Sequence, residues 1–354
     1  MRVLVTGADG YIGAVLGPRL LERGVEVVGL DCGFYRDGWL FNDPGPRPLT
    51  ITKDVRRITP TDVEGFDAVV HLAELSNDPL GELSERTTYD INHRGSVALA
   101  HACKEAGVPR FVYTSSCSVY GAADGDSERT EESAPNPQTA YARCKVLVER
   151  DVGALADEHF SPVFLRNATA FGASPRMRFD IVLNNLAGLA WALREIRMTS
   201  DGTPWRPLVH VEDICQAIIL ALTAPKEAVH KQIFNVGDDE QNYRIREVAT
   251  IVGQVFEGCD VRFGNPNGDN RSYRTSFRKI RRHLPEFRCQ WPAEVGARQL
   301  RDVFAQVDMT DSVFNFRAFT RLKQLNHLIT TKQIDGDFFW RSSNPMHSVA
   351  SEHA

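Results

Sequence analysis

The chain has 354 residues, of which 42% are hydrophobic, and 41 Lys and Arg against 46 Asp and Glu leave a net charge of −5. This ordinary globular composition excludes a chain that is disordered throughout, a collagen-like fibre and a disulfide scaffold. The acidic balance argues against a nucleic-acid partner bound through a strongly basic surface. At roughly 150 residues per domain, the length predicts about two domains.

The seven cysteines are odd in number, lie at scattered spacing and include no Cys-x-x-Cys pair. We therefore expect no metal site, and a reducing, cytoplasmic setting fits best. The first residues contain no long apolar stretch of the kind found in secretory signals. No segment approaches the ~18 apolar residues of a membrane span, so no membrane partner is expected.

Strands and helices alternate through the first half of the chain. Short apolar runs at residues 2–5, 25–30, 68–72, 110–114 and 162–165 predict strands, and residues 12–22, 97–106 and 138–154 have helical periodicity. Apolar runs without strict alternation indicate strands buried on both faces, as in a parallel sheet covered by helices. Pro18 is a local misfit, because proline inside a helix costs ~3 kcal/mol or bends it.

The alternation weakens after Arg166. A strand is predicted at 208–211, and helices at 213–222, 242–256 and 316–331. The expected fold is α/β, a doubly wound parallel (Rossmann) sheet with a smaller mixed α/β substrate domain. The first domain would hold residues 1–166, with 208–235 returning to it; the second would hold 167–207 and 236–335. Residues 341–354 are expected to form a mobile tail.

The turn after the first predicted strand carries the strongest local signal. Gly7, Gly10 and Gly13 are three residues apart, enclose Tyr11 and Ile12, and precede an amphipathic helix. Glycine permits a tight turn and a close approach of the backbone to a pyrophosphate. The helix N-terminus adds free N–H groups and positive potential. This context predicts a dinucleotide site more strongly than a plain connecting turn.

Asp31 ends the second predicted strand, 18 residues after Gly13. A carboxylate there accepts hydrogen bonds from the adenosine ribose and repels a 2′-phosphate, so NAD is favoured over NADP. The alternative is a turn aspartate, since Asp-Cys-Gly is also good turn chemistry. Asp54 and Val55 follow a further expected strand, where an acid would meet the adenine amino group.

Tyr141 and Lys145 are four residues apart on a predicted helix and therefore share a face. An ammonium group beside a phenol lowers the pKa of that phenol and fits it for acid–base catalysis beside a nicotinamide. Ser116 lies at the carboxyl end of a predicted strand, where open α/β sheets bind ligands. These three residues form the predicted catalytic group.

With these residues in this order, the chain resembles the extended short-chain dehydrogenase/reductases, and within them the nucleotide-sugar epimerase/dehydratase branch. The resemblance covers roughly residues 1–305. It includes His71-Leu72-Ala73, in which Leu72 and Ala73 would line the cofactor, and Asn92, which would contact the cofactor near the active site. It also includes the segments 206–213, 235–237 and 269–273.

The resemblance implies specific roles. Ser116 and Tyr141 would handle a substrate hydroxyl, and Lys145 would also hold the nicotinamide ribose. Arg206 and Arg271 would bind the diphosphate of a nucleotide-sugar substrate, although both are also compatible with surface ion pairs. The family further implies a homodimer formed through helices of the first domain.

Departures from the family pattern limit the reaction. The 4,6-dehydratases carry an acid and a base where this chain has Cys117 and Ser118, so a dehydratase is disfavoured. The substrate-side asparagine of the family is Thr169 here, and Asn167 is a candidate to replace it. Glu74 stands where the family has a small residue and would reach either substrate or solvent.

Arg176 and Arg178 follow the fifth predicted strand closely. They would either bind a sugar hydroxyl or phosphate of the substrate, or belong to a solvated loop. The buried pattern around His210 predicts a packed, hydrogen-bonded histidine.

The sequence thus favours an NAD-dependent nucleotide-sugar epimerase that acts through a transient keto-sugar, with Tyr141 as acid and base. The alternatives are an NAD(P)H-dependent reductase of keto-deoxysugar nucleotides, the disfavoured 4,6-dehydratase, and a non-catalytic NAD-sensing scaffold. The paired Tyr141 and Lys145 argue against the scaffold, which would not need them.

Overall fold

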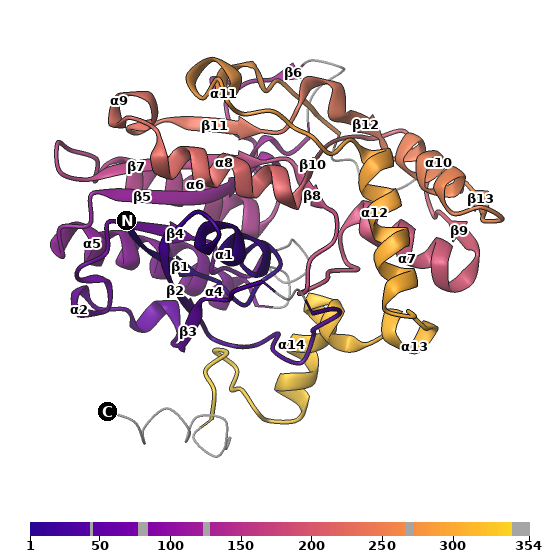
Figure 1. Ribbon diagram of the computed structural model, residues 1–354, viewed down its shortest axis with the longest axis horizontal. Coiled ribbons are helices and arrows are strands. Elements are labelled where there is room, and N and C mark those ends of the chain that lie inside the picture. Colours follow the sequence, from indigo (N-terminus) through magenta and orange to yellow (C-terminus); the bar gives the residue numbers. More distant parts are fainter. Residues whose placement is uncertain (43–44, 77–83, 123–127, 266–271, 342–354) are drawn as a thin grey trace.

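The structure is a computed structural model that describes residues 1–42, 45–76, 84–122, 128–265 and 272–341. Its centre is a seven-stranded parallel sheet in the order β11-β7-β5-β4-β1-β2-β3 (Figure 1). The strands are β1 (Arg2–Thr6), β2 (Glu26–Asp31), β3 (Leu49–Thr52), β4 (Ala68–His71), β5 (Arg110–Ser116), β7 (Ser161–Asn167) and β11 (Ile233–Val236). The predicted Rossmann-like sheet is confirmed.

Helices cover both faces of this sheet because the strands bury side chains in both directions. Val3 and Val5 of β1 pack with α1 (Gly13–Leu21) and α8 (Val211–Thr223). Leu4, between them, packs on the other face with α5 (Ser96–Glu105) and α6 (Ala140–Gly153). This alternation along one strand is what a sheet between two helical layers requires. Pro18 lies inside α1, which continues to Leu21.

A second, smaller cluster lies beside the carboxyl edge of the sheet. Its core joins α7 (Val182–Leu193), α10 (Ile245–Val255) and α12 (Ala293–Gln306), which Figure 1 shows together on the right. Next to it, β8 (Thr169–Phe171), β10 (Trp205–His210) and β12 (Asn242–Arg244) form a three-stranded sheet in the order β12-β10-β8. The strand predicted at 208–211 therefore pairs in this smaller sheet, and β11 is the segment that returns to the main one.

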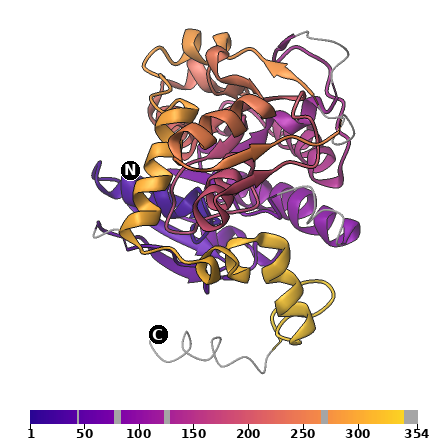
Figure 2. The ribbon, with the colours of Figure 1, turned by 90° about the vertical axis from the view of Figure 1, so that its right-hand side faces the viewer.

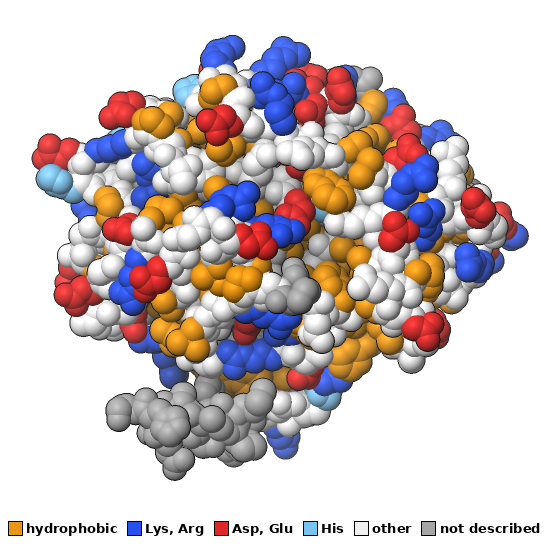
Figure 3. Space-filling view, in the orientation of Figure 1, with side chains coloured by type: hydrophobic (Ala, Val, Ile, Leu, Met, Phe, Trp, Pro, Cys, Tyr) orange, Lys and Arg blue, Asp and Glu red, His pale blue; other side chains and the backbone are white. Residues whose placement is uncertain are grey.

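The remaining elements are short. They are α2 (Pro60–Val63), α4 (Glu85–Thr88), α9 (Lys226–Val229), α11 (Arg278–His283), α13 (Asp311–Phe314), α14 (Arg321–Thr330), β6 (Glu128–Arg129), β9 (Glu195–Arg197), β13 (Asp260–Arg262), β14 (Arg274–Thr275), the π-helix η2 (Tyr89–Gly95), and the 3₁₀ turns η1 (Val55–Arg57), η3 (Cys117–Tyr120), η4 (Asp239–Gln241) and η5 (Arg317–Phe319). On the face in Figure 3, charged side chains of both signs are interspersed.

The C-terminal segment departs from the expected division into domains. Residues 317–340, here called the C-terminal strap, include α14, and their Leu325, Leu328 and Phe338 belong to the core beneath the main sheet. Figure 2 shows the yellow strap along the lower edge of the molecule, below the indigo to purple part. The predicted boundary of the second domain at 335 is therefore not where packing changes. Residues 342–354 of the predicted tail lie outside the described residues.

We expect Leu325→Ala to lower the free energy of unfolding by about 2–5 kcal/mol, because it removes a fully buried side chain from this core. The control is Leu193→Ala, whose side chain is 55% exposed and whose loss should change stability by less than ~0.5 kcal/mol. Urea unfolding of both variants measures the difference. Equal effects would show that the strap is not part of the core.

His210 predicts a specific dependence of stability on pH. The residue is fully buried, its Nε2 lies 2.8 Å from Gln299 Oε1, and burial lowers its pKa to about 4. As the pH falls from 6.5 to 4, His210 takes up a proton in the unfolded chain but stays neutral in the folded state, so the free energy of unfolding decreases. The loss is about 3 kcal/mol. Unfolding at pH 7 and pH 4.5 should therefore differ less in His210→Gln than in the wild type.

Candidate active site at the carboxyl edge of the sheet

Two cavities meet at the carboxyl edge of the main sheet. The first, the glycine-turn cavity, has a volume of about 930 Å³ and runs along the ends of β1, β2 and β4. Ten residues predicted to bind the cofactor line it: Gly7, Gly10, Tyr11, Ile12, Gly13, Asp31, Asp54, Val55, Leu72 and Ala73. Open parallel sheets bind ligands at this edge, where the strands end.

The turn at the start of α1 packs its backbone too closely for side chains at two of its glycines. Gly7 has φ of 74°, and a Cβ on it would lie 2.8 Å from the backbone N of Ala73. A Cβ on Gly13 would lie 2.3 Å from the carbonyl oxygen of Gly7. These contacts explain why glycine is required, and the exposed N-terminus of α1 favours an anion there.

Asp31 stands at the far end of the same cavity. Its carboxylate accepts hydrogen bonds from the backbone N–H groups of Gly33, at 2.7 Å, and Asp9, at 3.1 Å. Burial raises the pKa of this carboxyl, and the nearby Asp9 adds to the rise. Asp54 also lines the cavity, but its carboxylate is paired with Arg56 at 2.6 Å and caps η1. Asp31 is therefore the carboxylate placed to receive ribose hydroxyls.

Asn92 shapes the cavity from behind. Its side-chain oxygen accepts from the backbone N–H of Leu75 at 2.8 Å, and its amide donates to the Leu75 carbonyl at 3.0 Å. Leu75 lines the cavity and Asn92 is fully buried. The structure thus places Asn92 as a brace for the wall, rather than with the predicted cofactor contacts.

The second cavity, the tyrosine cavity, has a volume of about 1360 Å³. It brings together seven residues predicted from the sequence: Ser116, Tyr141, Lys145, Asn167, Thr169, Arg178 and Arg206. Arg271 lies outside the described residues. Ile12, Leu72, Glu74, Ser76, Ala170 and Arg178 line both cavities, so the two are continuous at that point.

Arg176 is not among the residues brought together. Its Nη1 donates to the backbone carbonyls of Tyr35, Arg36 and Gly38 at 2.7–3.1 Å, and its guanidinium lies over the Trp39 ring. It faces a separate cavity on the outer side of the glycine turn. Arg176 therefore neither lines the tyrosine cavity nor belongs to a solvated loop, the two settings predicted for it, but is buried and holds the loop after β2.

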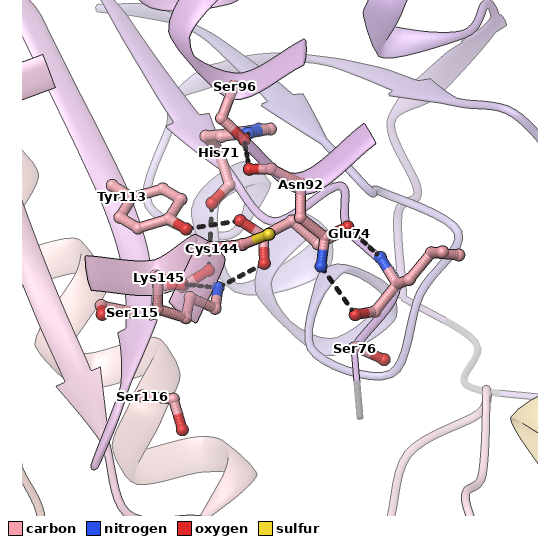
Figure 4. Close-up of polar contacts among 12 residues, drawn as sticks. His71, Glu74, Ser76, Asn92, Ser96, Tyr113, Ser115, Ser116, Cys144 and Lys145 are labelled. Carbon is pink, nitrogen blue, oxygen red and sulfur yellow. Dashed lines mark hydrogen bonds and ion pairs between the residues drawn. The ribbon is translucent and has the colours of Figure 1, made fainter. Parts of the chain in front are cut away.

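The start of α6 fixes the catalytic pair. The Thr139 hydroxyl accepts from the backbone N–H of Ala142 at 3.2 Å and caps the helix. Tyr141 and Lys145 follow on one side, with the Lys145 Nζ 5.4 Å from the centre of the Tyr141 ring. Ser116 ends β5, and its hydroxyl accepts from the N–H of Ser118 at 3.1 Å. Figure 4 shows Ser116 at the end of its strand, apart from the cluster around Lys145.

Glu74 is the unexpected member of the site. Its side chain is only 3% exposed, so it does not reach open solvent, but it lines both cavities. Its Oε2 lies 2.6 Å from Lys145 Nζ, and its Oε1 accepts from the Tyr113 hydroxyl at 2.5 Å, as Figure 4 shows. Lys145 also donates to the Thr114 carbonyl. The ammonium that the family resemblance assigns to the nicotinamide ribose is therefore already held by a carboxylate.

This pairing sets the charge of Lys145. Burial alone would make the ammonium form unfavourable, but the Glu74 carboxylate outweighs burial and raises the pKa of Lys145 above its usual value. Lys145 is thus a fixed positive charge beside Tyr141, and Glu74 is its counter-ion.

Cys117 and Ser118 follow Ser116 at the edge of the tyrosine cavity. The Cys117 thiol donates to the Arg166 carbonyl at 3.1 Å, and burial raises its pKa far above the usual range. Ser118 lines the cavity, and its hydroxyl oxygen is buried without a hydrogen-bond partner among the described residues. Neither residue is ionised near neutral pH. The pair therefore offers no carboxyl group to serve as the acid or the base in elimination of water.

Sequence reasoning missed several residues of the two cavities. Tyr35 and Arg321 line the glycine-turn cavity without having been predicted, whereas Tyr273, which lies in the predicted segment 269–273, lines the tyrosine cavity with its ring centre 5.7 Å from the Arg206 guanidinium. Tyr35 lies four residues after Asp31, so the end of β2 was a usable signal. No local signal marks Arg321, because only the folded strap brings it to the site.

Comparison with known proteins agrees with this geometry. Residues 3–237 match the model of the NAD dependent epimerase/dehydratase family. The chain is an enzyme of that family, and its cofactor is NAD. The glycine turn, which a Cβ would fill, and the carboxylate of Asp31 fit that dinucleotide.

Among curated relatives, the chain is 33% identical to a UDP-glucose 4-epimerase of Yersinia pestis over 269 residues, 67% of this chain and 78% of the relative. It is 29% identical to a UDP-glucose 4-epimerase of Streptomyces lividans over 270 residues, 72% of this chain and 80% of the relative. Among solved structures, it matches MoeE5 in complex with UDP-glucuronic acid and NAD at a TM-score of 0.75 and 27% identity, covering 86% of this chain and 99% of that one.

Two further features concern the residues that the structure describes. Their histidines, cysteines and carboxylates form no group of three or more that would hold a metal ion. Their helices include none with the length and apolar character needed to cross a membrane.

We expect Glu74→Gln to lower the free energy of unfolding by about 3–5 kcal/mol, because it leaves the buried Lys145 ammonium without its carboxylate. Urea unfolding measures the loss at pH 7.

The matched control is Glu85→Gln. This change breaks an exposed ion pair between Glu85 and Arg143, which lies on α6, the helix that also carries Lys145. That pair is worth at most ~1 kcal/mol. If Glu74→Gln cost no more than the control, Lys145 would not depend on Glu74.

Proposed function

We propose that this protein is an epimerase of nucleotide-diphosphate sugars that inverts a hydroxyl-bearing carbon through a transient keto-sugar. One observation carries the proposal. The cavity that holds Ser116, Tyr141 and Lys145 opens into the cavity of the glycine turn, so a substrate hydroxyl and a nicotinamide can meet where they join.

Tyr141 is the acid and base of this reaction. The fixed charge of Lys145 beside its ring favours the phenolate, which takes the proton of a substrate hydroxyl and later returns it. NAD, when bound, supplies a hydride acceptor and donor for the same carbon. Ser116 stands at the end of β5 on the same cavity, where its hydroxyl can bond to the reacting oxygen.

The polar lining of the tyrosine cavity supports a sugar as the substrate. Asn167 Oδ1 and Ser118 Oγ are buried there and make no hydrogen bond to another described residue. Both suit hydroxyl groups, and buried polar atoms of this kind are normally satisfied by a ligand or water. Arg206 and Tyr273 also line this cavity, and a guanidinium and an aromatic ring suit a nucleoside diphosphate.

The names of similar proteins also support an epimerase. Two of them are named UDP-glucose 4-epimerase, and the structure of MoeE5 holds a UDP-sugar acid with NAD. The buried thiol of Cys117 and the hydroxyl of Ser118 offer no acid and base for loss of water, which favours epimerisation over dehydration.

The experiment that tests the proposal incubates purified protein and NAD with UDP-, dTDP-, GDP- and CDP-sugars, beginning with UDP-glucose and UDP-galactose. Products are separated by chromatography and weighed by mass spectrometry. An isomer of unchanged mass, formed without net NADH, supports the epimerase. A product lighter by one water, or a product reduced only when NADH is added, would overturn it.

We expect Tyr141→Phe to lower the turnover of the identified substrate by roughly 10²–10⁴-fold, because the acid–base group is lost. Binding of NAD, measured by calorimetry, should not change.

Tyr89→Phe serves as the control. Tyr89 accepts a hydrogen bond from Arg143 at 3.0 Å outside both cavities, so this variant should keep its rate. If Tyr141→Phe also kept most of its rate, the acid–base assignment would be wrong.

A further inference from the structure

Two arginines that were not predicted to bind the cofactor also line the glycine-turn cavity. Arg178 comes from the segment after β8, and Arg321 is the first residue of α14 in the C-terminal strap. Both line the cavity and both are more than nine-tenths buried, with residue exposures of 7% and 3%. Two guanidinium groups this deep in a protein require anionic partners.

The protein itself supplies negative charge to these arginines. Arg178 Nε donates to Asp180 Oδ1 at 2.9 Å, and the other Asp180 oxygen accepts from the backbone N–H of Arg321 at 3.1 Å. Asp180 therefore lies against both arginines, and Asp31, which lines the same cavity, is a second carboxylate whose charge acts on Arg321.

Several donor groups in this cluster have no acceptor. Arg178 Nη2 is buried without a hydrogen-bond partner among the described residues, and so is the hydroxyl of Tyr35. The guanidinium of Arg321 lies flat on the Tyr35 ring, with Cζ 3.9 Å from its centre. Burial, reinforced by the charge of Arg178, lowers the pKa of Arg321 to about 10. The three side chains line one cavity and lack a common acceptor.

We propose that Arg321 and Arg178 bind the diphosphate of the dinucleotide, opposite the N-terminus of α1, so that the C-terminal strap completes the cofactor site. Guanidinium groups match phosphate oxygens in geometry and charge. The helix N-terminus and the two arginines would then hold the same anion from two sides.

The contacts of the strap agree with this placement. The Gln324 amide donates to the Phe34 carbonyl at 3.0 Å, and the Trp340 indole donates to the Cys32 carbonyl at 2.6 Å. Arg56 donates to the Asp337 carbonyl at 2.7 Å. These contacts join the strap to the segments after β2 and η1, directly beside Asp31 and Asp54. Arg321 is thereby held in the wall of the glycine-turn cavity.

The tyrosine cavity is the other possible source of a diphosphate, because Arg178 lines both cavities. Arg321 lines only the glycine-turn cavity. We therefore assign the pair to the cofactor, and the test separates the two sources. It measures binding without a sugar substrate, so its outcome does not depend on the proposed reaction.

The experiment measures affinity for NAD, ADP-ribose, adenosine and UDP by calorimetry on protein freed of bound nucleotide. Arg321→Met and Arg178→Met keep the length of the side chain and remove its charge. We expect each to weaken NAD and ADP-ribose at least tenfold and to leave adenosine within twofold. Arg321→Met should leave UDP unchanged, and Arg321→Lys should recover part of the affinity for NAD.

Arg317→Met is the matched control. It lies in the same strap, its guanidinium pairs with Asp37 at 2.6 Å, and it does not line the cavity. It should bind NAD as the wild type does. Thermal unfolding and the retained affinity for adenosine show that each variant is folded.

Three outcomes would overturn the proposal. They are unchanged affinity for ADP-ribose in Arg321→Met, an equal loss for adenosine and ADP-ribose, and a loss confined to UDP, which would assign the anion to the substrate.

Discussion

The buried ion pair between Arg166 of β7 and Glu149 of α6 is the contact on which the active site depends. Arg166 Nη2 lies 2.6 Å from Glu149 Oε2, and both side chains are at most 5% exposed. Ser115 of β5 donates to the other Glu149 oxygen, and Arg166 also donates to the Tyr120 hydroxyl at 3.0 Å. This network ties one helix to two strands and to η3. It thereby fixes Lys145, about one turn earlier on α6, and Tyr141, about two turns earlier, relative to the end of β5.

The same constraint explains why charged side chains are buried around the cavities. Lys145 with Glu74, Arg166 with Glu149 and Arg178 with Asp180 are pairs in which every side chain is at most 12% exposed. Buried pairs contribute little to stability compared with apolar residues of similar volume. They instead fix the positions of the charged side chains, because a charged group deep in a protein can satisfy its hydrogen bonds in few positions. Lys145 stays beside Tyr141 because its ammonium is held by the Glu74 carboxylate and the Thr114 carbonyl.

What the sequence could predict follows from the range of each interaction. The glycine turn, Asp31 at a strand end and the spacing of Tyr141 and Lys145 depend on a few neighbouring residues, and the structure places them along two joined cavities. The pairing of Glu74 with Lys145 joins residues that are 71 positions apart, so the departure from the family was visible but its partner was not. Arg176 shows the opposite case. It is close to the predicted site residues in sequence, but its guanidinium donates to backbone carbonyls of the loop after β2.

The C-terminal strap was the hardest part to predict, because its residues act far from their neighbours in sequence. The periodicity of 316–331 predicted a helix, and α14 occupies 321–330, but periodicity does not say which core a helix joins. Leu325 and Leu328 settle that in the fold by packing beneath the main sheet, which carries Arg321 to the glycine turn. The apolar face of one helix thus sets the position of a charge 290 residues away from Asp31 in the sequence. Under the proposed contact between Arg321 and the dinucleotide, such a strap would couple the folding of the C-terminus to the binding of the cofactor.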